Sequence, residues 1–364
     1  MPYQPTVRFA VIGLNHNHIY PLVKTLRAAG GNLVAFFAPE DDLASAFSSE
    51  HQGAARVDRM AHILEDDSIQ LVVSAAIPDE RAGIGLQAMH HGKDFLTDKP
   101  GFTTLDQIAE AQRAHAETGQ LFYVGYGRLS SRAMHRAGEL VRTGAIGRPV
   151  QTIGLGPHRI NAPTRPPWFY QRARYGGIIT DLGSHLVEQF LFFTGATTAD
   201  VVSAQVANYN HAHYPELEDF GDAVLRGDNG SSGYLRVDWF TPDGLSSFGD
   251  QRLTVLGTDG YLEVRGTCDL AGRPNGEHLF LVDHQSVQYI DCHDVDPQFG
   301  RRLLEDITHR TQTVMSQRHC FEASTLALRA EETAHLITSN HRAHQNPAWA
   351  AESTSGYNTQ GKDV

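Results

Sequence analysis

The chain has 364 residues, of which 41% are hydrophobic and 20% charged, a composition that allows buried cores and excludes bulk disorder. Its 30 Lys and Arg residues against 42 Asp and Glu leave a net charge of −12, which argues against nucleic acid or a membrane surface as the main partner. The length predicts two domains, and no apolar run reaches the ~18 residues that a membrane span needs.

The N-terminus and the cysteines bear on the compartment. Residues 1–8 are polar and run directly into an apolar segment, so no secretory signal is visible. The three cysteines, at positions 268, 292 and 320, are an odd and widely spaced set that fits neither a disulfide framework nor a zinc motif. We therefore expect a cytoplasmic protein with reduced thiols.

The first third of the chain alternates between strand-like and helix-like segments. This alternation predicts an α/β Rossmann-type domain over residues 1–128, with a parallel sheet covered by helices on both faces. The strands are expected at 7–12, 33–38, 69–76, 94–97 and 121–125, and the helices at 19–29, 81–91 and 105–118.

The turn after the first strand is the natural phosphate site of such a sheet, because backbone N–H groups of the next helix point there. A dinucleotide fingerprint places glycine at positions 13, 15 and 18, but only Gly13 is present. We predict cofactor contacts from Gly13, Leu14, Asn15 and His16. An equal alternative is that His16 and His18 are exposed loop residues that bind no ligand. A metal role for His16 and His18 is not predicted, since no third ligand is evident nearby in the sequence.

The end of the second strand should carry an acid that binds the adenosine ribose of NAD. Ala38 stands at this position, and Glu40 with two aspartates follows it. No arginine is present there to meet a 2′-phosphate, which favours NAD over NADP without excluding NADP. The acids could equally cap the next helix.

Two later segments resemble one known family. Asp98-Lys99-Pro100 follows a strand, and residues 176–188 read Gly-Gly-Ile-Ile-Thr-Asp-Leu-Gly-Ser-His-Leu-Val-Glu. Together they resemble the glucose–fructose oxidoreductase, inositol dehydrogenase and rhizopine-catabolism (Gfo/Idh/MocA) family, which carries Glu-Lys-Pro and a glycine-rich Asp-x-Gly-x-His at these places. The resemblance spans roughly residues 5–340 and includes Ile77-Pro78 and residues 144–149.

The resemblance implies that Lys99, Asp181 and His185 are the catalytic set for oxidation of a sugar CH–OH group. Histidine suits a general base near neutral pH, and an ammonium stabilises a developing alkoxide. If residues 180–193 are helical, Asp181 and His185 share one face, so the carboxylate can orient the imidazole. An exchange of roles between Lys99 and His185 stays open. Taken singly, the lysine reads as a solvated loop charge and the Asp–His pair as a surface pair.

Further side chains are candidates for the same cleft. Trp168 could face the nicotinamide or a sugar ring, or pack at the edge of the core. A metal site made of His158, Asp181 and His185 is not supported by ligand spacing, so no metal is expected. The remaining candidates are Ile77 and Pro78 for the cofactor, and Tyr126, Arg128, His158 and Arg172 for the substrate.

The second half of the chain changes character. Seven strand-like segments between residues 201 and 292, several separated by Gly-containing turns, predict a large and mostly antiparallel open sheet. Helices expected at 301–312 and 322–340 complete an α+β domain over residues 129–346, followed by a polar tail at 347–364. The resemblance implies a homodimer or homotetramer that uses the open face of this sheet.

The leading functional prediction is an NAD(P)-dependent sugar or polyol dehydrogenase. A second class uses the same fold for a glycosidase or lyase reaction with transient oxidation and no net redox change. A third is a non-catalytic sensor, which the joint presence of Lys99, Asp181 and His185 disfavours.

Overall fold

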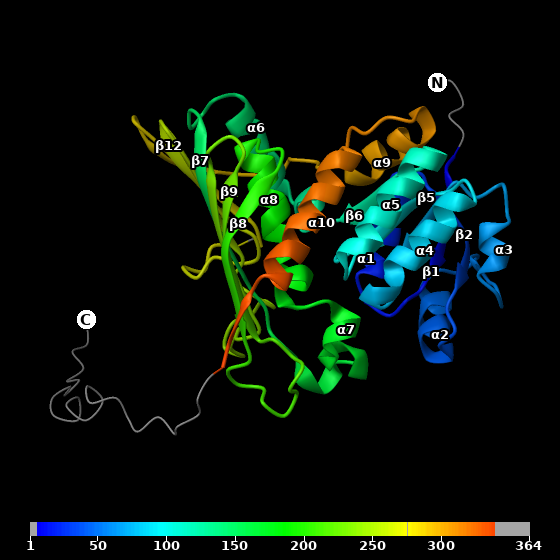
Figure 1. The fold of residues 1–364 in the computed structure, drawn as a ribbon. Coiled ribbons are helices and arrows are strands. Elements are labelled where there is room, and N and C mark those ends of the chain that lie inside the picture. Colours follow the sequence, from blue (N-terminus) through cyan, green and yellow to red (C-terminus); the bar gives the residue numbers. More distant parts are fainter. Residues whose placement is uncertain (1–5, 275, 339–364) are drawn as a thin grey trace, which may run out of the picture.

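Two β-sheets organise the chain in the computed structural model, which describes residues 6–274 and 276–338 (Figure 1). A six-stranded sheet lies in the N-terminal domain and a nine-stranded sheet in the C-terminal domain. The predicted polar tail, residues 347–364, lies outside the described residues.

The N-terminal sheet is parallel throughout, with strand order β3-β2-β1-β4-β5-β6. This confirms the Rossmann-type prediction, and the order reverses between β1 and β4, where such folds bind ligands. β4 is buried at every position, as its apolar composition predicts, and β5 is equally buried although it begins and ends with an aspartate. The strands are β1 (Arg8–Ile12), β2 (Asn32–Phe37), β3 (Ala55–Arg56), β4 (Leu71–Ser74), β5 (Asp94–Asp98) and β6 (Phe122–Gly125).

Local signals explain where the helices of this domain begin and end. Thr104 and Gln107 form a capping box at the start of α5, and Gly119, with φ 70°, ends it. Asp41 and Asp42 lie in the first turn of α2, where their negative charges stabilise the positive end of the helix dipole. This agrees with the alternative that these acids support the start of the helix. The helices are α1 (Ile19–Ala28), α2 (Asp41–Glu50), α3 (Ala61–Leu64), α4 (Pro78–His90) and α5 (Leu105–Thr118).

The C-terminal sheet has the order β14-β13-β12-β11-β7-β10-β9-β8-β15 and is mostly antiparallel, as predicted. The β7–β10 and β8–β15 pairs are parallel. The strands are β7 (Pro149–Pro157), β8 (Ala199–Ala207), β9 (Phe220–Gly227), β10 (Ser232–Asp238), β11 (Arg252–Gly257), β12 (Gly260–Arg265), β13 (His278–Asp283), β14 (Val287–Ile290) and β15 (His335–Ile337).

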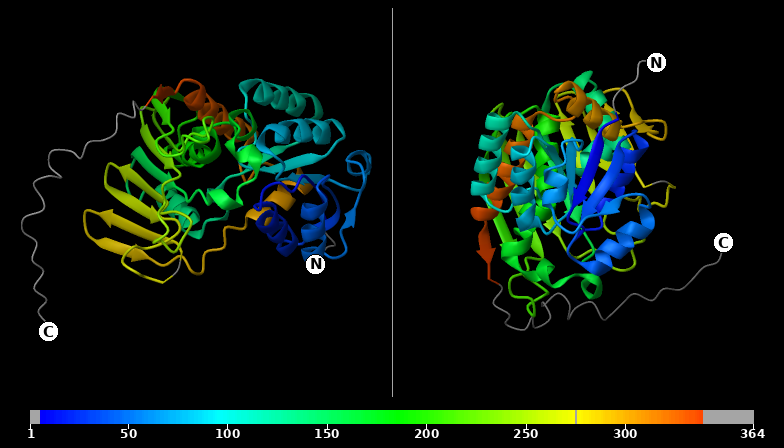
Figure 2. Two further views of the ribbon diagram at one scale, coloured as in Figure 1. Left: turned by 90° about the horizontal axis from the view of Figure 1, so that it is seen from below. Right: turned by 90° about the vertical axis from the view of Figure 1, so that its right-hand side faces the viewer.

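Helices cover only one face of this sheet. In Figures 1 and 2, α6, α8 and α10 lie between the sheet and the Rossmann domain, and no helix among residues 6–274 and 276–338 covers the opposite face. Glycines in β7 and β10 make room for α8: a Cβ at Gly233 would lie 2.7 Å from the Phe190 ring. The remaining helices are α6 (Arg132–Arg142), α7 (Arg172–Tyr175), α8 (Ser184–Thr194), α9 (Phe299–His309), α10 (Gln317–Glu332), the 3₁₀ turns η1 (Gly127–Ser130), η2 (Ala162–Thr164) and η3 (Pro167–Tyr170), and the π-helix η4 (Ile179–Gly183).

Two helix predictions are wrong in extent. The helix expected at 322–340 ends at Glu332, and residues 335–337 instead form β15, because the edge of β8 offers backbone hydrogen-bond partners; residues 339 and 340 lie outside the described residues. The helix expected at 180–193 begins as the π-helix η4 and becomes α-helical only from Ser184.

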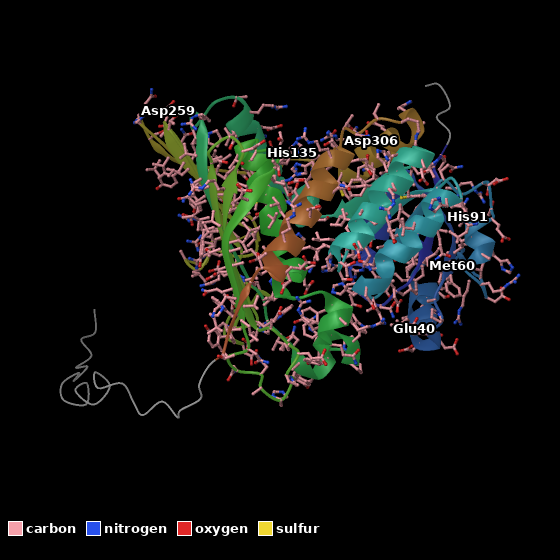
Figure 3. All side chains as sticks on the ribbon, viewed as in Figure 1. Glu40, Met60, His91, His135, Asp259 and Asp306 are labelled. Atoms are coloured by element: carbon pink, nitrogen blue, oxygen red, sulfur yellow. The ribbon has the colours of Figure 1, made fainter. Side chains whose placement is uncertain are left out.

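The last two helices also belong to the packing of the Rossmann domain. The Gln317 side-chain amide bonds both the N–H and the C=O of Phe122, at 2.7 and 3.0 Å, and so covers the edge strand β6. Tyr123 donates from its hydroxyl to Asp306 of α9, a residue labelled in Figure 3. The C-terminal helices therefore couple the two domains.

Among residues 6–274 and 276–338, no helix is both long and apolar enough to cross a lipid bilayer. The three cysteines are all free thiols.

Candidate active site

The turn after β1 has the close packing of a dinucleotide turn although two of its three glycines are missing. Gly13 adopts φ 84°, and a Cβ there would lie 2.5 Å from the Cβ of Ala76, which follows β4. The His16 N–H donates to the Ala75 carbonyl at 2.9 Å. The turn therefore connects the ends of β1 and β4 at the point where the strand order reverses. Leu14 is buried in the same turn.

Glu40 offers a carboxylate to a ligand at the end of β2. Its Oε1 accepts a hydrogen bond from the Asn15 side chain at 2.8 Å, and its Oε2 is buried without a partner among the described residues. Figure 3 labels Glu40 beside α2. An unsatisfied buried oxygen at this position suits the hydroxyls of an adenosine ribose. Ala38 itself is buried and contributes only backbone.

Arg56 is a nearby cation that the sequence reasoning missed. It lies in β3, and its guanidinium donates to the Ala38 carbonyl at 3.1 Å and to Asp41 at 2.8 Å. The expectation that no arginine stands near the ribose position is therefore wrong, because the neighbouring strand supplies one. The sequence argument for NAD over NADP, which relied on no arginine being near this position, therefore no longer holds.

Arg81 holds together the loops that follow β4 and β5. Its side chain is fully buried and donates to the carbonyl oxygens of Ala76, Lys99 and Pro100 at 2.7, 2.6 and 3.0 Å. Burial lowers the pKa of this guanidinium, and the Asp98 carboxylate opposes that shift. Nothing in the local sequence marks Arg81 as buried, since it follows Asp79 and Glu80 in the first turns of α4. Ile77 and Pro78 open α4 at the same edge of the sheet.

The Lys99 ammonium of the first domain binds the Asp181 carboxylate of the second, with 2.8 Å between Nζ and Oδ1. The two side chains are only 6% and 15% exposed. Burial alone would raise the pKa of Asp181, but the neighbouring Lys99 charge holds it below its ordinary value. A buried, charged pair therefore joins the domains at the end of β5.

His185 lies one turn after Asp181 and has a defined tautomer. The Gly127 N–H donates to its Nδ1 at 3.1 Å, so in the neutral ring the proton is on Nε2. Burial, and then the Lys99 charge, lower the pKa of His185 to about 3. His185 is thus a neutral imidazole that offers a hydrogen-bond donor at Nε2.

His158, at the end of β7, has the opposite tautomer. Its Nδ1 lies 3.0 Å from the Gly156 carbonyl oxygen, to which it can only donate, so Nε2 carries a lone pair. Burial, and then the Lys99 charge, lower the pKa of His158 to about 4. The Lys99 charge therefore acts on two neutral imidazoles, one with a donor at Nε2 and one with an acceptor at Nε2.

Four other candidate residues, Tyr126, Arg128, Trp168 and Arg172, make contacts within the protein itself. The Tyr126 hydroxyl pairs with Ser324 at 3.0 Å in a fully buried position, although its ring centroid lies 6.2 Å from that of His185. Arg128 binds the buried Glu188 through two nitrogens. Trp168 is half-buried and packs against the core, in agreement with the alternative that it lies at the edge of the core. The predicted substrate roles of Tyr126 and Arg128 thus compete with structural ones.

Arg172 also has a structural position. It donates to Glu218 at 3.0 Å and to Glu331 at 2.9 Å. Glu331, in α10, in turn accepts the backbone N–H groups of Ile179 and Thr180 at 2.7 and 3.2 Å. Because these residues open the π-helix that carries Asp181, this cluster determines where that carboxylate lies.

The contact of Glu331 with the start of the π-helix also explains why position 177 is glycine. Gly177 adopts φ 97°, and a Cβ there would lie 2.2 to 2.5 Å from the carboxyl atoms of Glu331. Only glycine lets the chain pass this close to the buried carboxylate. Sequence reasoning recognised the glycines as part of a motif but did not identify Glu331, which lies about 150 residues later.

Replacing Glu331 by glutamine is expected to flatten the pH dependence of stability. Burial, and then the neighbouring Glu218, raise the pKa of Glu331 to about 8. Because the folded-state pKa lies above the unfolded value of ~4.3, this group's contribution is full at low pH and is lost as the pH rises through about 8. E331Q should lose less unfolding free energy than the parent between about pH 6 and pH 9 in urea titrations.

The exposed neighbour Glu332 supplies the control for this experiment. E332Q should follow the parent chain across the same pH range. If E331Q and the parent lose equal unfolding free energy, Glu331 is ionised in the folded protein and this account of the cluster fails.

Comparison with known proteins assigns the family. Residues 7–126 match the family described as "Oxidoreductase family, NAD-binding Rossmann fold", and residues 134–263 match the GFO/IDH/MocA C-terminal domain. The chain belongs to the Gfo/Idh/MocA family. It is an oxidoreductase-family protein with an NAD-binding domain, and the resemblance stated from Asp98-Lys99-Pro100 and residues 176–188 is confirmed.

Individual relatives agree with this assignment. A crystal structure of a protein from Erwinia carotovora atroseptica, described as an oxidoreductase, is 46% identical, with a TM-score of 0.89 over 92% of this chain and 100% of that one. The 1,5-anhydro-D-fructose reductase of Ensifer adhaerens is 25% identical over 70% of this chain and 74% of its own length. A levoglucosan dehydrogenase in complex with NADH and levoglucosan shares the fold, with 15% identity and a TM-score of 0.76 over 90% of this chain and 97% of its own.

Proposed function

We propose that this Gfo/Idh/MocA protein transfers hydride between a carbinol carbon of a sugar or polyol and NAD or NADP. The observation that supports this most directly is the buried Lys99–Asp181 pair at the carboxyl end of β5, whose lysine charge acts on His158 and His185. Gly13 and the unsatisfied Glu40 oxygen fit a dinucleotide bound across the β1–β4 crevice. When bound, the nicotinamide supplies the hydride acceptor or donor.

Lys99 carries the proton in this proposal. The Asp181 carboxylate holds the Lys99 ammonium in place at 2.8 Å, so the ammonium can donate to a carbonyl oxygen and stabilise a developing alkoxide. In the oxidative direction the neutral amine accepts the hydroxyl proton. Asp181 orients Lys99 and balances its charge.

The two histidines then bind hydroxyl groups. His185 has its proton on Nε2 and a pKa of about 3, so it donates a hydrogen bond to an oxygen and does not accept a proton near neutral pH. His158 presents an acceptor and can bind a substrate O–H. One donor and one acceptor around an ammonium fit adjacent hydroxyl and carbonyl oxygens, as in a sugar or polyol. Of the two role assignments left open by the sequence, this favours Lys99 as acid and base.

A substrate panel tests the proposal. The full-length protein is incubated with NAD or NADP and with aldoses, inositols, anhydrosugars and glycosides, and the absorbance of the reduced nicotinamide is followed. We expect net reduction of the cofactor with at least one sugar or polyol. Turnover of a glycoside without net reduction would instead support the redox-cycling lyase, and turnover of neither kind would contradict the proposal.

We also propose a homo-oligomer and a cytoplasmic location. The uncovered face of the C-terminal sheet exposes apolar side chains on three neighbouring strands, namely Ile153, Leu256 and Tyr261, each 37 to 41% accessible. Such a patch favours association with a second copy, and the three free thiols fit a reducing compartment. The mass of the protein in solution checks the first point.

A further inference from the structure

Two histidines and one aspartate converge at the turn after β1. The Nδ1 of His18 lies 2.9 Å from Oδ1 of Asp98, and the Nδ1 of His16 lies 3.5 Å from Oδ2 of the same carboxylate. All three ligand atoms lie within 4.8 Å of one another. The third ligand that the sequence did not reveal is thus supplied by the end of β5, about 80 residues away.

The contact between His16 and Asp98 pairs two acceptors. The His18 backbone N–H donates to the Nδ1 of His16 at 3.2 Å, so this nitrogen carries a lone pair and no proton. A lone pair therefore faces a carboxylate oxygen with no hydrogen between them, an arrangement that a cation would satisfy.

The Asp98 charge is only partly compensated by its other neighbours. Arg81 approaches it at 3.4 Å, a longer distance than its bonds to three carbonyl oxygens, and Lys99 turns to Asp181. The side chains of His18 and Arg81 approach separate oxygens of the Asp98 carboxyl group, at 2.9 and 3.4 Å. The side chains of His16 and His18 are 23% and 49% exposed, which leaves a path from solvent.

We propose that His16, His18 and Asp98 form a binding site for a divalent transition-metal ion of the zinc class. Two imidazoles and one carboxylate are a common ligand set for such ions and leave positions open for oxygen ligands. Bonds of about 2.0–2.2 Å space tetrahedral ligand atoms about 3.3–3.6 Å apart. The candidate ligand atoms of the three residues lie within 4.8 Å of one another, so rotations of their side chains could bring them to this spacing. His18 needs to move its proton to Nε2, and its side chain is about half exposed.

The proposed metal site lies next to Lys99, which the proposed function places at the reaction centre. Asp98 directly precedes Lys99, and His16 contributes to the electrostatic environment of Asp181. The open positions of the ion would accept oxygen atoms of a ligand held in the same crevice. The metal site does not depend on the proposed hydride transfer, and it can be tested in the absence of any cofactor or sugar.

Cobalt titration provides the test. The full-length, metal-free protein is titrated with Co²⁺, whose visible absorption reports a site of low coordination number, and Zn²⁺ is then added in competition. We expect absorption that saturates at one Co²⁺ per chain and disappears with Zn²⁺. H16N and H18N should each lower the Co²⁺ affinity at least about tenfold.

A matched variant controls for binding elsewhere on a chain with 20 histidines. His62 forms an exposed pair with Asp58 at 3.0 Å, so H62N removes a histidine–aspartate pair that lacks the third ligand. H62N should bind Co²⁺ like the parent. Binding that does not saturate at one equivalent, or an affinity in H16N and H18N equal to that of the parent, would overturn the proposal. Circular dichroism of the variants shows whether any loss comes from misfolding.

Discussion

Replacing Lys99 by methionine is expected to lower kcat about 10²–10⁴-fold on whichever sugar or polyol the substrate panel identifies. The substitution keeps the length of the side chain but removes the ammonium that Asp181 holds at 2.8 Å. Without it, neither the proton nor the positive charge is available at the reacting oxygen. Steady-state kinetics with saturating cofactor measure the loss, and cofactor binding followed by fluorescence shows whether the first domain stays intact.

Two further variants separate charge from proton transfer. K99R keeps a positive charge that does not release its proton near neutral pH, so it should remain as impaired in kcat as K99M if Lys99 carries the proton. K24M replaces an exposed lysine in α1 and should leave kcat unchanged. A K99R enzyme with nearly full activity would show that another group, with His185 the first candidate, transfers the proton.

The second large effect concerns stability. Replacing Arg128 by alanine is expected to cost about 3–5 kcal/mol of unfolding free energy, because it leaves the carboxylate of Glu188 buried without its main partner. Glu188 is completely buried, and Arg128 binds it through Nε at 2.8 Å while also stacking 3.7 Å from the centroid of Phe192. Burial alone would raise the pKa of Glu188, but Arg128 lowers it to about 2. Urea unfolding measures the change.

An exposed ion pair gives the control for this variant. Arg136 and Glu139 lie three residues apart in α6 at 2.7 Å, both more than a third exposed, and R136A should change the unfolding free energy by about 0.5 kcal/mol or less. If R128A folds as stably as the parent but raises the KM of the sugar, Arg128 contacts substrate, as the sequence suggested, and the structural role assigned here is wrong.

Several parts of the fold follow from local chemistry. The buried β-branched run at Leu71–Ser74 and the capped helix at Leu105–Thr118 could be located because hydrophobic period, capping residues and glycines act within a few positions. The change from alternating strands and helices to hairpins likewise separated the two domains. β15 could not be located, because its only reason to be a strand is the edge of β8, which is distant in sequence.

The candidate site likewise contains residues that the sequence identified and residues that only the structure revealed. Lys99, Asp181 and His185 stood out through family motifs, and the structure joins the first two directly. The roles of Arg81 and Glu331 depend on burial and on backbone groups of distant loops, which no local pattern encodes.

The amino-acid sequence by itself predicted the parallel and antiparallel sheets and the family, because these are carried by hydrophobic periodicity and by short motifs, and the same motifs proposed Lys99, Asp181 and His185 as site residues. Only the tertiary structure decided the histidine tautomers, the partners of Arg128 and Arg172, and the meeting of His16 and His18 with Asp98. Each of these depends on hydrogen bonds or ion pairs between segments that are distant in the chain, and their geometry exists only once the sheets have packed.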